Sequence, residues 1–467
     1  MKNNYDVIIV GGGPAGLFAA YELSDSFDVA IFEMGNDIKN RQCPEEDKGY
    51  CTSCHPCNIT SGIGGGGGLS DGKLIYPNEK YSSSLTVGGN FLDYVSKEKT
   101  IEKMKQVEKI FRENGADKEI YGLDDEKVND LLKKANIAGI DFIPLIQTHV
   151  GSDNMPGVIY NLESEIKKKN ADFYTRREVS KIDHKNKKIF TANGESFGYD
   201  QLILAVGRTG ASKLGEWIDE IGIEMEETPE ARSVDVGIRV EVPNSIMEDV
   251  TKINYDPKFR MKSRRDDYIR TFCTCPEGWV IRENYEDFSL VNGHSKYKEK
   301  SNNTNFALLN HTTFTDPFKK PNEWGKNLGK LTTKLGGGDP IIQRLGDLKN
   351  GRRSTRERIR KNITIQPTLK SAVPGDISLS YPYRVMENLM DGLEQLDRVI
   401  PGVASDSTLL YAPEIKFYSI KLKLSDVMET SVSDIYAIGD GAGVSRGITG
   451  ASVSGLIAAE GIKRKYK

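Results

Sequence analysis

Residues 6–16 read DVIIVGGGPAG, and they are the strongest indication of the fold in the sequence. Its first five residues are rich in β-branched side chains, which is typical of a strand covered on both faces in a parallel sheet. Three of the glycines that follow match the spacing G-x-G-x-x-G. Residues 17–24 then predict a helix, and residues 28–32 predict a second strand that ends at Glu33. This order of elements predicts a Rossmann-type dinucleotide-binding unit.

Each part of this motif has a physical role in dinucleotide binding. Gly11 permits a tight turn, Gly13 lets the backbone approach a pyrophosphate, and Gly16 lets the helix pack closely on the strand. The start of the helix presents N–H groups and a partial positive charge to the phosphates. A carboxylate at the end of the second strand would accept hydrogen bonds from the hydroxyls of an adenosine ribose. The residues expected to contact the dinucleotide here are Gly11, Gly13, Pro14, Ala15, Gly16 and Glu33.

The carboxyl-terminal segment predicts a second part of the same site. Residues 435–440, IYAIGD, predict a strand that ends in Gly439 and Asp440, and a helix is expected from about residue 449 to residue 463. This pattern resembles the second flavin fingerprint of FAD proteins in the glutathione-reductase-like superfamily. The resemblance implies that Asp440 accepts a hydrogen bond from the ribitol chain. It also implies that small residues such as Gly450 and Ala451 let the helix lie close to the isoalloxazine.

The middle of the chain predicts a third part. Residues 201–207, QLILAVG, resemble the strand that ends in Ala-Thr-Gly in the same proteins, with Val206 in the threonine position and Gly207 at the end. Residues 171–182 predict a strand, and the same resemblance places its backbone near Val179 beside the adenine. Three separated segments that return to one sheet favour FAD over NAD as the resident cofactor. No second strand–GxGxxG–helix unit follows, so NAD(P)H is expected only as a transient electron donor.

A glycine-rich stretch, residues 61–74, reads SGIGGGGGLSDGKL. A backbone with five consecutive glycines can press its N–H groups against a flat ring or a phosphate without steric cost. Lys73 would lie near the reactive N5 edge of the flavin, where it would neutralise the reduced ring or orient an acidic substrate; a surface lysine is the alternative. In related flavoproteins the loop at this position lines the flavin, which implies that role for Gly66, Gly67, Gly68, Ser70 and Asp71.

Four cysteines precede this loop with the spacing C-x7-C-x2-C-x2-C, and the remaining two are Cys273 and Cys275. The run C-x2-C-x2-C is half of an iron–sulfur ligand pattern, and such thiolates also bind zinc. A metal site is therefore one interpretation, with His55 as an additional candidate ligand. A redox-active thiol pair near the flavin and reduced structural cysteines are the other two. The candidate metal ligands are Cys43, Cys51, Cys54 and Cys57.

Motifs spread along nearly the whole chain resemble one family. They are residues 41–44 (RQCP), 70–74 (SDGKL), 149–153 (HVGSD), 270–276 (RTFCTCP) and 439–447 (GDGAGVSRG). Together they are similar to uncharacterised prokaryotic FAD-dependent dehydrogenases, also described as NAD(P)/FAD-dependent oxidoreductases. The resemblance implies bound FAD and a two-part architecture, but no particular substrate. His294 stands where an apolar residue is expected, which makes it the second candidate, beside Lys73, for a contact near the reacting centre.

The predicted fold class is α/β, with a Rossmann-type FAD-binding domain and an inserted α+β substrate domain. A helical excursion is expected where apolar residues recur at helical spacing among Lys and Glu. The inserted domain is expected where strand-like alternation begins, as in residues 234–240. The predicted parts are residues 1–95, 141–211 and 410–467 (FAD-binding domain), 96–140 (helical excursion) and 212–409 (inserted domain).

Composition narrows the class of protein further. The 467 residues contain 64 Lys and Arg against 67 Asp and Glu, a net charge of −3 that argues against non-specific nucleic-acid binding. Two basic stretches, residues 258–265 and 349–361, are more often solvated faces than nucleic-acid sites. No apolar window is long enough to span a membrane, and six cysteines are too few for a secreted disulfide framework. With no secretory leader at its start, the chain is expected in the cytoplasm.

These observations predict an FAD-dependent oxidoreductase that transfers hydride between a small-molecule substrate and flavin N5. One alternative is a flavin/iron–sulfur protein that relays electrons to a partner. A second alternative is an RNA-modifying flavoenzyme that uses the two basic stretches. The sequence identifies no general acid or base, no substrate and no oligomeric state.

Overall fold

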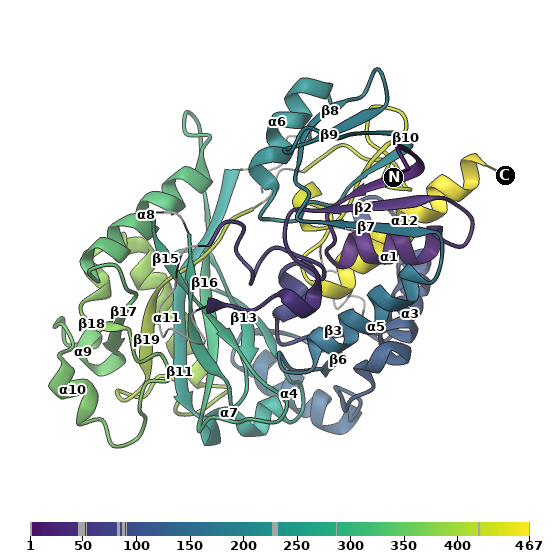
Figure 1. The fold of residues 1–467 in the computed structure, drawn as a ribbon. Coiled ribbons are helices and arrows are strands. Elements are labelled where there is room, and N and C mark those ends of the chain that lie inside the picture. Colours follow the sequence, from purple (N-terminus) through teal and green to yellow (C-terminus); the bar gives the residue numbers. More distant parts are fainter. Residues whose placement is uncertain are drawn as a thin grey trace. The chain divides into compact units, whose positions relative to one another are not determined.

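The structure of the protein is a computed structural model that describes residues 2–44, 52, 54–81, 85, 89, 91–226, 232–285, 287–418 and 421–466. The chain divides into two compact units, and each has its own large sheet (Figure 1). The predicted α/β class is confirmed. The domain limits expected from the sequence stay a prediction. The first unit comprises Met1–Glu119, Thr148–Thr228 and Ser419–Lys467, and the second comprises Ile120–Gln147 and Pro229–Tyr418.

A seven-stranded sheet forms the core of the first unit, in the order β7-β2-β1-β10-β9-β8, with β20 paired to β10. Neighbours among β7, β2, β1, β10 and β20 are parallel, whereas β8 and β9 are antiparallel. Val7, Ile8 and Ile9 are fully buried, as expected for a strand covered on both faces. The strands are β1 (Asn4–Val10), β2 (Val29–Glu33), β7 (Ala171–Thr175), β8 (Val179–Asp183), β9 (Lys188–Thr191), β10 (Ser196–Leu204) and β20 (Ile435–Ala437).

Helices α1 and α12, from opposite ends of the chain, lie side by side next to this sheet (Figure 1). They approach so closely that a Cβ atom on Gly455 would lie 2.2 Å from the carbonyl oxygen of Ala15. The helices of the first unit are α1 (Pro14–Leu23), α3 (Lys97–Phe111), α5 (Met155–Lys167), α6 (Ala211–Ile221) and α12 (Ile448–Lys465), and the short strand β3 spans Lys73–Tyr76.

One predicted strand, over residues 171–182, is two strands in the structure. β7 ends at Thr175, and Arg176 adopts a positive φ of 55° that turns the chain before β8 begins. The turn is fixed to the end of β2, because the backbone N–H of Arg177 donates to the carbonyl oxygen of Glu33. β8 therefore pairs with β9 and leaves the parallel part of the sheet.

An eight-stranded sheet forms the core of the second unit, in the order β18-β17-β19-β11-β16-β13-β12-β5. Its strands are β5 (Asp141–Ile143), β11 (Ser233–Pro243), β12 (Lys258–Lys262), β13 (Tyr268–Cys275), β16 (Asn303–Thr313), β17 (Ile341–Arg344), β18 (Val373–Pro374) and β19 (Leu409–Lys416). A separate antiparallel ribbon joins β14 (Trp279–Asn284) to β15 (Ser289–His294), while β4 spans Ile120–Tyr121 and β6 spans Ile146–His149. The helices are α4 (Asp125–Ile137), α7 (Asn244–Thr251), α8 (Pro321–Leu335), α9 (Leu345–Lys349), α10 (Arg356–Arg360) and α11 (Tyr383–Asp397).

The two faces of this second sheet differ in chemistry. On one face Ile238 pairs with Leu308, and α11 packs there, since a Cβ on Gly392 would meet the side chains of Ile269 and Leu308. On the other face, the alternate residues of β11 are charged but no less buried: Asp235, Arg239 and Glu241 are each 0% exposed. This second face, here called the polar face, therefore holds ionised groups out of contact with water.

We expect the contact between α1 and α12 to make Gly455 indispensable for stability. Gly455→Ala would bring a methyl group into backbone atoms that cannot move aside, which should destabilise the protein by about 1–3 kcal/mol in urea unfolding. Gly157 is the matched control, because it is an exposed helical glycine with no atom within 4 Å of an added Cβ. Gly157→Ala should leave stability unchanged or raise it by up to about 1 kcal/mol. Equal effects of the two substitutions would contradict this account of the packing.

Candidate functional site

The first glycine loop is shaped by close backbone contacts. A Cβ on Gly11, where φ is 111°, would lie 2.3 Å from the carbonyl oxygen of Ala205. A Cβ on Gly16 would lie 2.1 Å from the carbonyl oxygen of Gly11. Side chains are thus excluded at both positions. α1 begins at Pro14 with no side chain capping its amino terminus, which suits an anion at that end.

The Glu33 carboxylate joins three loops at the end of β2. It is buried, and it accepts hydrogen bonds from the backbone N–H groups of Gly12 (2.8 Å), Gly35 (2.9 Å) and Gly62 (2.9 Å). A carboxylate offers about four acceptor positions. Three are in use, so Glu33 has room for one further donor, not for both ribose hydroxyls that the sequence suggested.

Arg41 organises the glycine-rich segment. Its buried guanidinium donates to the carbonyl oxygens of Asn58 (2.9 Å), Ile59 (2.6 Å), Ile63 (2.8 Å) and Gly65 (2.7 Å). Burial lowers the pKa of Arg41 to about 10, against an opposing contribution from the nearby Glu33 carboxylate, so the side chain stays charged at neutral pH. One cation thereby fixes the whole path of the chain from residue 58 to residue 65.

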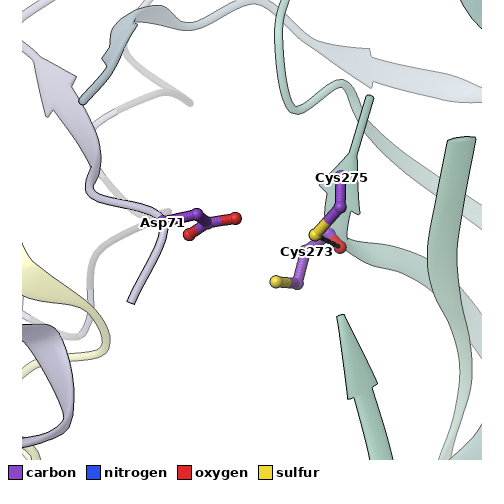
Figure 2. Close-up of side chains that lie close together, drawn as sticks. All are labelled: Asp71, Cys273 and Cys275. Carbon is purple, nitrogen blue, oxygen red and sulfur yellow. Dashed lines mark hydrogen bonds between the residues drawn. The ribbon is translucent and has the colours of Figure 1, made fainter. Parts of the chain in front are cut away.

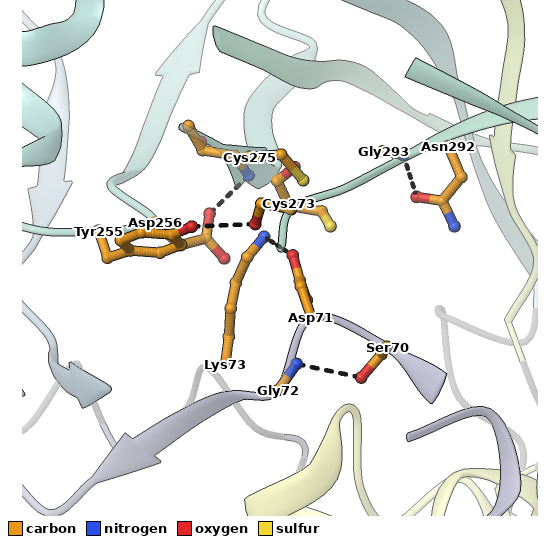
Figure 3. Close-up of polar contacts among 12 residues, drawn as sticks. Ser70, Asp71, Gly72, Lys73, Tyr255, Asp256, Cys273, Cys275, Asn292 and Gly293 are labelled. Atoms are coloured by element: carbon orange, nitrogen blue, oxygen red, sulfur yellow. Dashed lines mark hydrogen bonds and ion pairs between the residues drawn. The ribbon is translucent and has the colours of Figure 1, made fainter. Parts of the chain in front are cut away.

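The glycine-rich segment lies against the first glycine loop. The N–H of Gly64 donates to the carbonyl oxygen of Gly12 at 2.7 Å, and a Cβ on Gly67 would lie 3.1 Å from the ring of Pro14. The segment forms a short 3-10 turn, η2 (Gly65–Leu69). Ser70 closes this turn by donating to the carbonyl oxygen of Gly67 and accepting from the N–H of Gly72 (Figure 3).

The carboxyl-terminal segment reaches the same place. β20 continues into η8 (Asp440–Ala442), where a Cβ on Gly441 would lie 2.6 Å from the carbonyl oxygen of Gly207. A Cβ on Gly439 would lie 3.1 Å from the Cβ of Ala15 in the first turn of α1. Residues 11–16, 205–207 and 439–443 therefore meet where parallel strands β1, β10 and β20 end.

Asp440 is held by its neighbours in this segment. Its Oδ1 accepts from the hydroxyl of Ser445 at 2.9 Å, and its Oδ2 lies 3.6 Å from the Nε of Arg208. Burial raises the pKa of Asp440, while Arg208 and Arg446 act in the opposite direction. A hydroxyl donor beside this carboxylate would be bound in a largely dehydrated setting.

The space around individual glycines indicates where a ligand could approach the backbone. A Cβ added to Gly66, Gly207 or Gly447 would meet no protein atom within 4 Å, although neighbouring glycines are tightly packed. Gly66 lies in the glycine-rich segment, Gly207 just after β10 and Gly447 just before α12. The backbone there borders space that the described side chains do not fill, and a dinucleotide bound along the backbone fits that arrangement.

Lys73 lies at the start of β3, and its Nζ is 3.1 Å from Oδ2 of Asp71 (Figure 3). Its side chain is 10% exposed. It lines a cavity of about 40 Å³ together with Arg446, Gly447 and Thr449. The N–H of Ile75 donates to the hydroxyl of Thr449 at 3.0 Å, which fixes β3 beside the start of α12. Lys73 is thus a nearly buried cation next to the carboxyl-terminal part of the glycine-lined site.

A cluster of polar side chains lies on the polar face of the second unit. Asp235 accepts hydrogen bonds from the guanidinium of Arg270 (2.9 and 2.5 Å), from Nδ1 of His311 (2.8 Å) and from the hydroxyl of Tyr418 (2.9 Å). Burial opposes the charge on Asp235, but Arg270 and His311 outweigh it and lower the pKa of this carboxyl well below its usual range. Because an ionised carboxylate only accepts, Nδ1 of His311 carries the proton in this hydrogen bond.

Comparisons with known families match both units. Residues 9–46 match the family model described as NAD(P)-binding Rossmann-like domain. Residues 233–416 match the model described as FAD-dependent protein, C-terminal domain-like. These two matches support FAD as the cofactor of the protein. Its place in the glutathione-reductase-like superfamily stays a prediction.

Individual proteins add little about its chemistry. An uncharacterised protein of Clostridium beijerinckii is 26% identical over 487 residues, covering 98% of this chain and 81% of that protein. Glycine oxidase from Geobacillus kaustophilus shares 12% identity at a TM-score of 0.42, over 99% of this chain and 95% of that one. L-proline dehydrogenase from P. horikoshii shares 9% identity at a TM-score of 0.40, over 100% and 94%. Such distant likenesses identify no substrate.

The remaining predicted site residues are placed as follows. Val179 opens β8 and is buried, and Gly450 and Ala451 lie in the first turn of α12. His294 ends β15 in the second unit, where its ring lies 5.7 Å from that of Trp279. The roles assigned to these residues stay predictions.

The cysteine cluster near the glycine-rich segment is only partly described. Cys43, Cys54 and Cys57 are reduced, and Cys51 lies outside the described residues. Within the described part of the chain, these three sulfur atoms do not gather within 4.8 Å of one another. An iron–sulfur cluster or zinc ion there, and NAD(P)H as electron donor, remain predictions. Also among the described residues, no helix combines the length and the apolar character needed to cross a bilayer.

The Asp235 cluster was not predicted from the sequence. Its signal was present in residues 233–241, where charged residues alternate with valine and isoleucine. Such alternation is normally typical of a strand with one face in water. It cannot reveal that both faces are covered.

The lowered pKa of Asp235 predicts a stability that depends on pH. Since the folded state holds this carboxyl ionised, its stabilisation is complete above the unfolded pKa of about 3.9 and is lost as pH falls below it. Asp235→Asn should therefore cost about 3–5 kcal/mol at pH 7 and flatten the decline of stability between about pH 4 and pH 2. Urea unfolding at a series of pH values measures both effects.

Asp287 provides the control for this prediction. It forms an exposed ion pair with Lys330 at 2.8 Å in the same unit. Asp287→Asn should cost less than about 1 kcal/mol. An Asp235→Asn protein as stable as the parent at pH 7 would show that the cluster contributes no net stabilisation.

Proposed function

We propose that this protein is an oxidoreductase that binds FAD in the glycine-lined site of the first unit and transfers hydride between a small-molecule substrate and flavin N5. The observation that carries the proposal is the meeting of three distant segments, residues 11–16, 205–207 and 439–443, at the carboxyl ends of parallel strands. The crevice outside those strand ends is where open α/β sheets bind ligands. Each segment contributes a backbone that a ligand can approach closely.

The binding roles follow from chemistry at each position. Gly11, Gly13 and Gly16 with the start of α1 would hold the pyrophosphate, because that helix end offers N–H groups and a partial positive charge. Glu33 would accept one ribose hydroxyl, and Asp440 a ribitol hydroxyl. The remaining contacts would come from backbone and small side chains: Pro14, Ala15, Gly66, Gly67, Gly68, Ser70, Asp71, Val179, Gly207, Gly439, Gly450 and Ala451.

Lys73 would act on charge at the reacting end of the site. When bound, FAD supplies the group that accepts or donates the hydride. Lys73 is nearly buried, so its cation is screened little by water and would favour negative charge beside it, on the reduced ring or on an acidic substrate. The Asp71 partner at 3.1 Å would fix the position of Nζ. His294 stays a weaker candidate for a substrate contact, and NAD(P)H remains a candidate electron donor.

Glu33→Gln tests the FAD site itself. The amide can keep one oxygen on the N–H groups of Gly35 and Gly62, but its NH2 group would face the N–H of Gly12. That contact lowers the stability of the protein. The neutral amide also loses the charged acceptor proposed for a ribose hydroxyl, a hydrogen bond worth about 1.5–3 kcal/mol, which corresponds to roughly a 10- to 150-fold weaker FAD affinity. Titration of apoprotein with FAD, followed by flavin fluorescence, measures this change. Glu195→Gln, at a partly exposed pair with Arg177, should leave the affinity unchanged.

Failure of the wild-type apoprotein to take up FAD would refute the proposed function outright. Wild-type binding with an unaltered affinity in the Glu33→Gln protein would refute only the role of Glu33.

Lys73→Ala tests the electrostatic role. Removing a nearly buried cation should disfavour the reduced, anionic flavin about tenfold, or about 30 mV in midpoint potential for a two-electron couple, while FAD stays bound. Dye-equilibration titration of the holoprotein measures the potential without knowledge of the substrate. Lys105→Ala is the control, because Lys105 is exposed and pairs with Glu79 at the surface. Equal potentials in the parent and the Lys73→Ala protein would reject this role.

A further inference from the structure

Cys273 and Cys275 lie two residues apart in a distorted part of β13. The register between β13 and β16 shifts between Phe272 and Cys275, and Cys273 has a positive φ of 49°. This bulge brings the two sulfur atoms within 4.8 Å of each other (Figure 2; Asp71, also drawn, belongs to the other unit). In a regular strand, the Cα atoms of residues i and i+2 lie about 6.6–7.2 Å apart, which is near the upper limit of the Cα–Cα distance in a disulfide. The bulge departs from this regular geometry, so it removes that obstacle to a bond between the two sulfur atoms.

Arg239 contacts both cysteines from β11. Its Nη2 donates to the carbonyl oxygen of Cys273 at 2.7 Å and lies 3.3 Å from Sγ of Cys275. Its Nε donates to the side chain of Asn305 at 2.8 Å, so the guanidinium cannot turn away. Gly293 makes room for it, since a Cβ there would lie 1.9 Å from Nη2.

The charge next to Cys275 is permanent. The Arg239 side chain is 0% exposed, and an arginine in a protein does not lose its proton. A fixed positive charge at hydrogen-bond distance favours thiolate over thiol. The same charge repels a metal cation, which argues against a metal role for this pair.

The backbone around the pair is also fixed. The N–H of Thr274, between the two cysteines, donates to Oδ1 of Asp256 at 2.8 Å (Figure 3). Lys258 pairs with the other carboxylate oxygen of Asp256 at 2.5 Å. The sulfur atoms thus lie on a fixed bulge of β13, and the two cysteines differ in exposure: Cys275 is buried, whereas Cys273 is partly exposed.

We propose that Cys273 and Cys275 form a redox-active dithiol that exchanges with low-molecular-weight disulfides of the glutathione type. The Cys273 thiolate attacks one sulfur of the external disulfide, so that its S–S bond breaks, one thiolate leaves and a mixed disulfide forms. The Cys275 thiolate, held beside Arg239, then attacks Sγ of Cys273 and expels the second thiolate. The two cysteines lose two electrons and become a disulfide, and the external disulfide becomes two thiols.

The experiment uses a peptide that trypsin releases. Cleavage after Arg270 and Arg282 gives residues 271–282, TFCTCPEGWVIR, which contain both cysteines and no other. The native FAD-loaded protein is equilibrated in buffers of increasing oxidised-to-reduced glutathione ratio, alkylated in denaturant, digested and analysed by mass spectrometry. We expect one two-electron transition as the ratio rises. The doubly alkylated peptide should be replaced by an unalkylated peptide whose mass is two hydrogens below that of the free dithiol peptide. The same assay on protein stripped of FAD separates this result from the proposed function.

Single variants distinguish the two steps. Cys275→Ser should accumulate a glutathione adduct on Cys273, and Cys273→Ser should form neither adduct nor disulfide at the buried Cys275. Arg239→Lys should lose the contact with Sγ of Cys275, destabilise the reduced form about tenfold and lower the midpoint by about 30 mV. If that variant does not fold, the wild-type titration and the two serine variants still decide the proposal.

Three results would overturn the proposal. They are a peptide that stays doubly alkylated at every glutathione ratio while the protein remains folded, a wild-type protein that stops at the glutathione adduct, and protection from alkylation by a bound metal that a chelator removes.

Discussion

The Glu33 carboxylate is the interaction on which the loops of the first unit depend. It sits at the end of β2 and gathers three backbone N–H groups, from Gly12, Gly35 and Gly62, that belong to three different loops. Without it, those buried N–H groups would be left without an acceptor, at a cost of about 1–3 kcal/mol each. Arg41 complements it by collecting carbonyl oxygens from the same segment. Glu33 and Arg41 therefore fix the conformation of glycine-rich loops that have few side chains of their own to pack.

The second unit holds polar and charged side chains on a buried face of its sheet. Asp235 is held by Arg270, His311 and Tyr418, and Glu241 by the hydroxyls of Thr368 and Tyr411. Each carboxyl group has several partners, drawn from other strands and from loops of the same unit. Such networks specify the register of the strands, since a shift by one residue would leave buried charges unpaired. The apolar face beside α11 alone would not distinguish those registers.

The sequence predicted the first unit well because its signals are local. Residues 6–16 and 435–440 each carry strand, glycine and carboxylate in a fixed order, and the structure shows these strands in one parallel sheet. The turn at Arg176 was not predicted, because it depends on the carbonyl oxygen of Glu33 more than 140 residues earlier in the chain. The cluster around Asp235 was hidden for a similar reason. Burial of both sheet faces arises from tertiary packing, so it cannot be predicted from the alternation of residues along a strand.

Arg239 is hard to explain by stability alone. Taking a guanidinium out of water costs several kcal/mol even after relaxation, and buried ion pairs can often be replaced by apolar residues without loss of stability. Its Nη1 lies 3.6 Å from Glu414, which is beyond hydrogen-bond distance, so this pair recovers only part of the cost. The two shortest hydrogen bonds of the guanidinium go to the carbonyl oxygen of Cys273 and the side chain of Asn305, and the sulfur of Cys275 lies at 3.3 Å. Because carbonyl and amide oxygens could be satisfied by a neutral donor, the groups that require a positive charge here are the Glu414 carboxylate and a thiolate of Cys275.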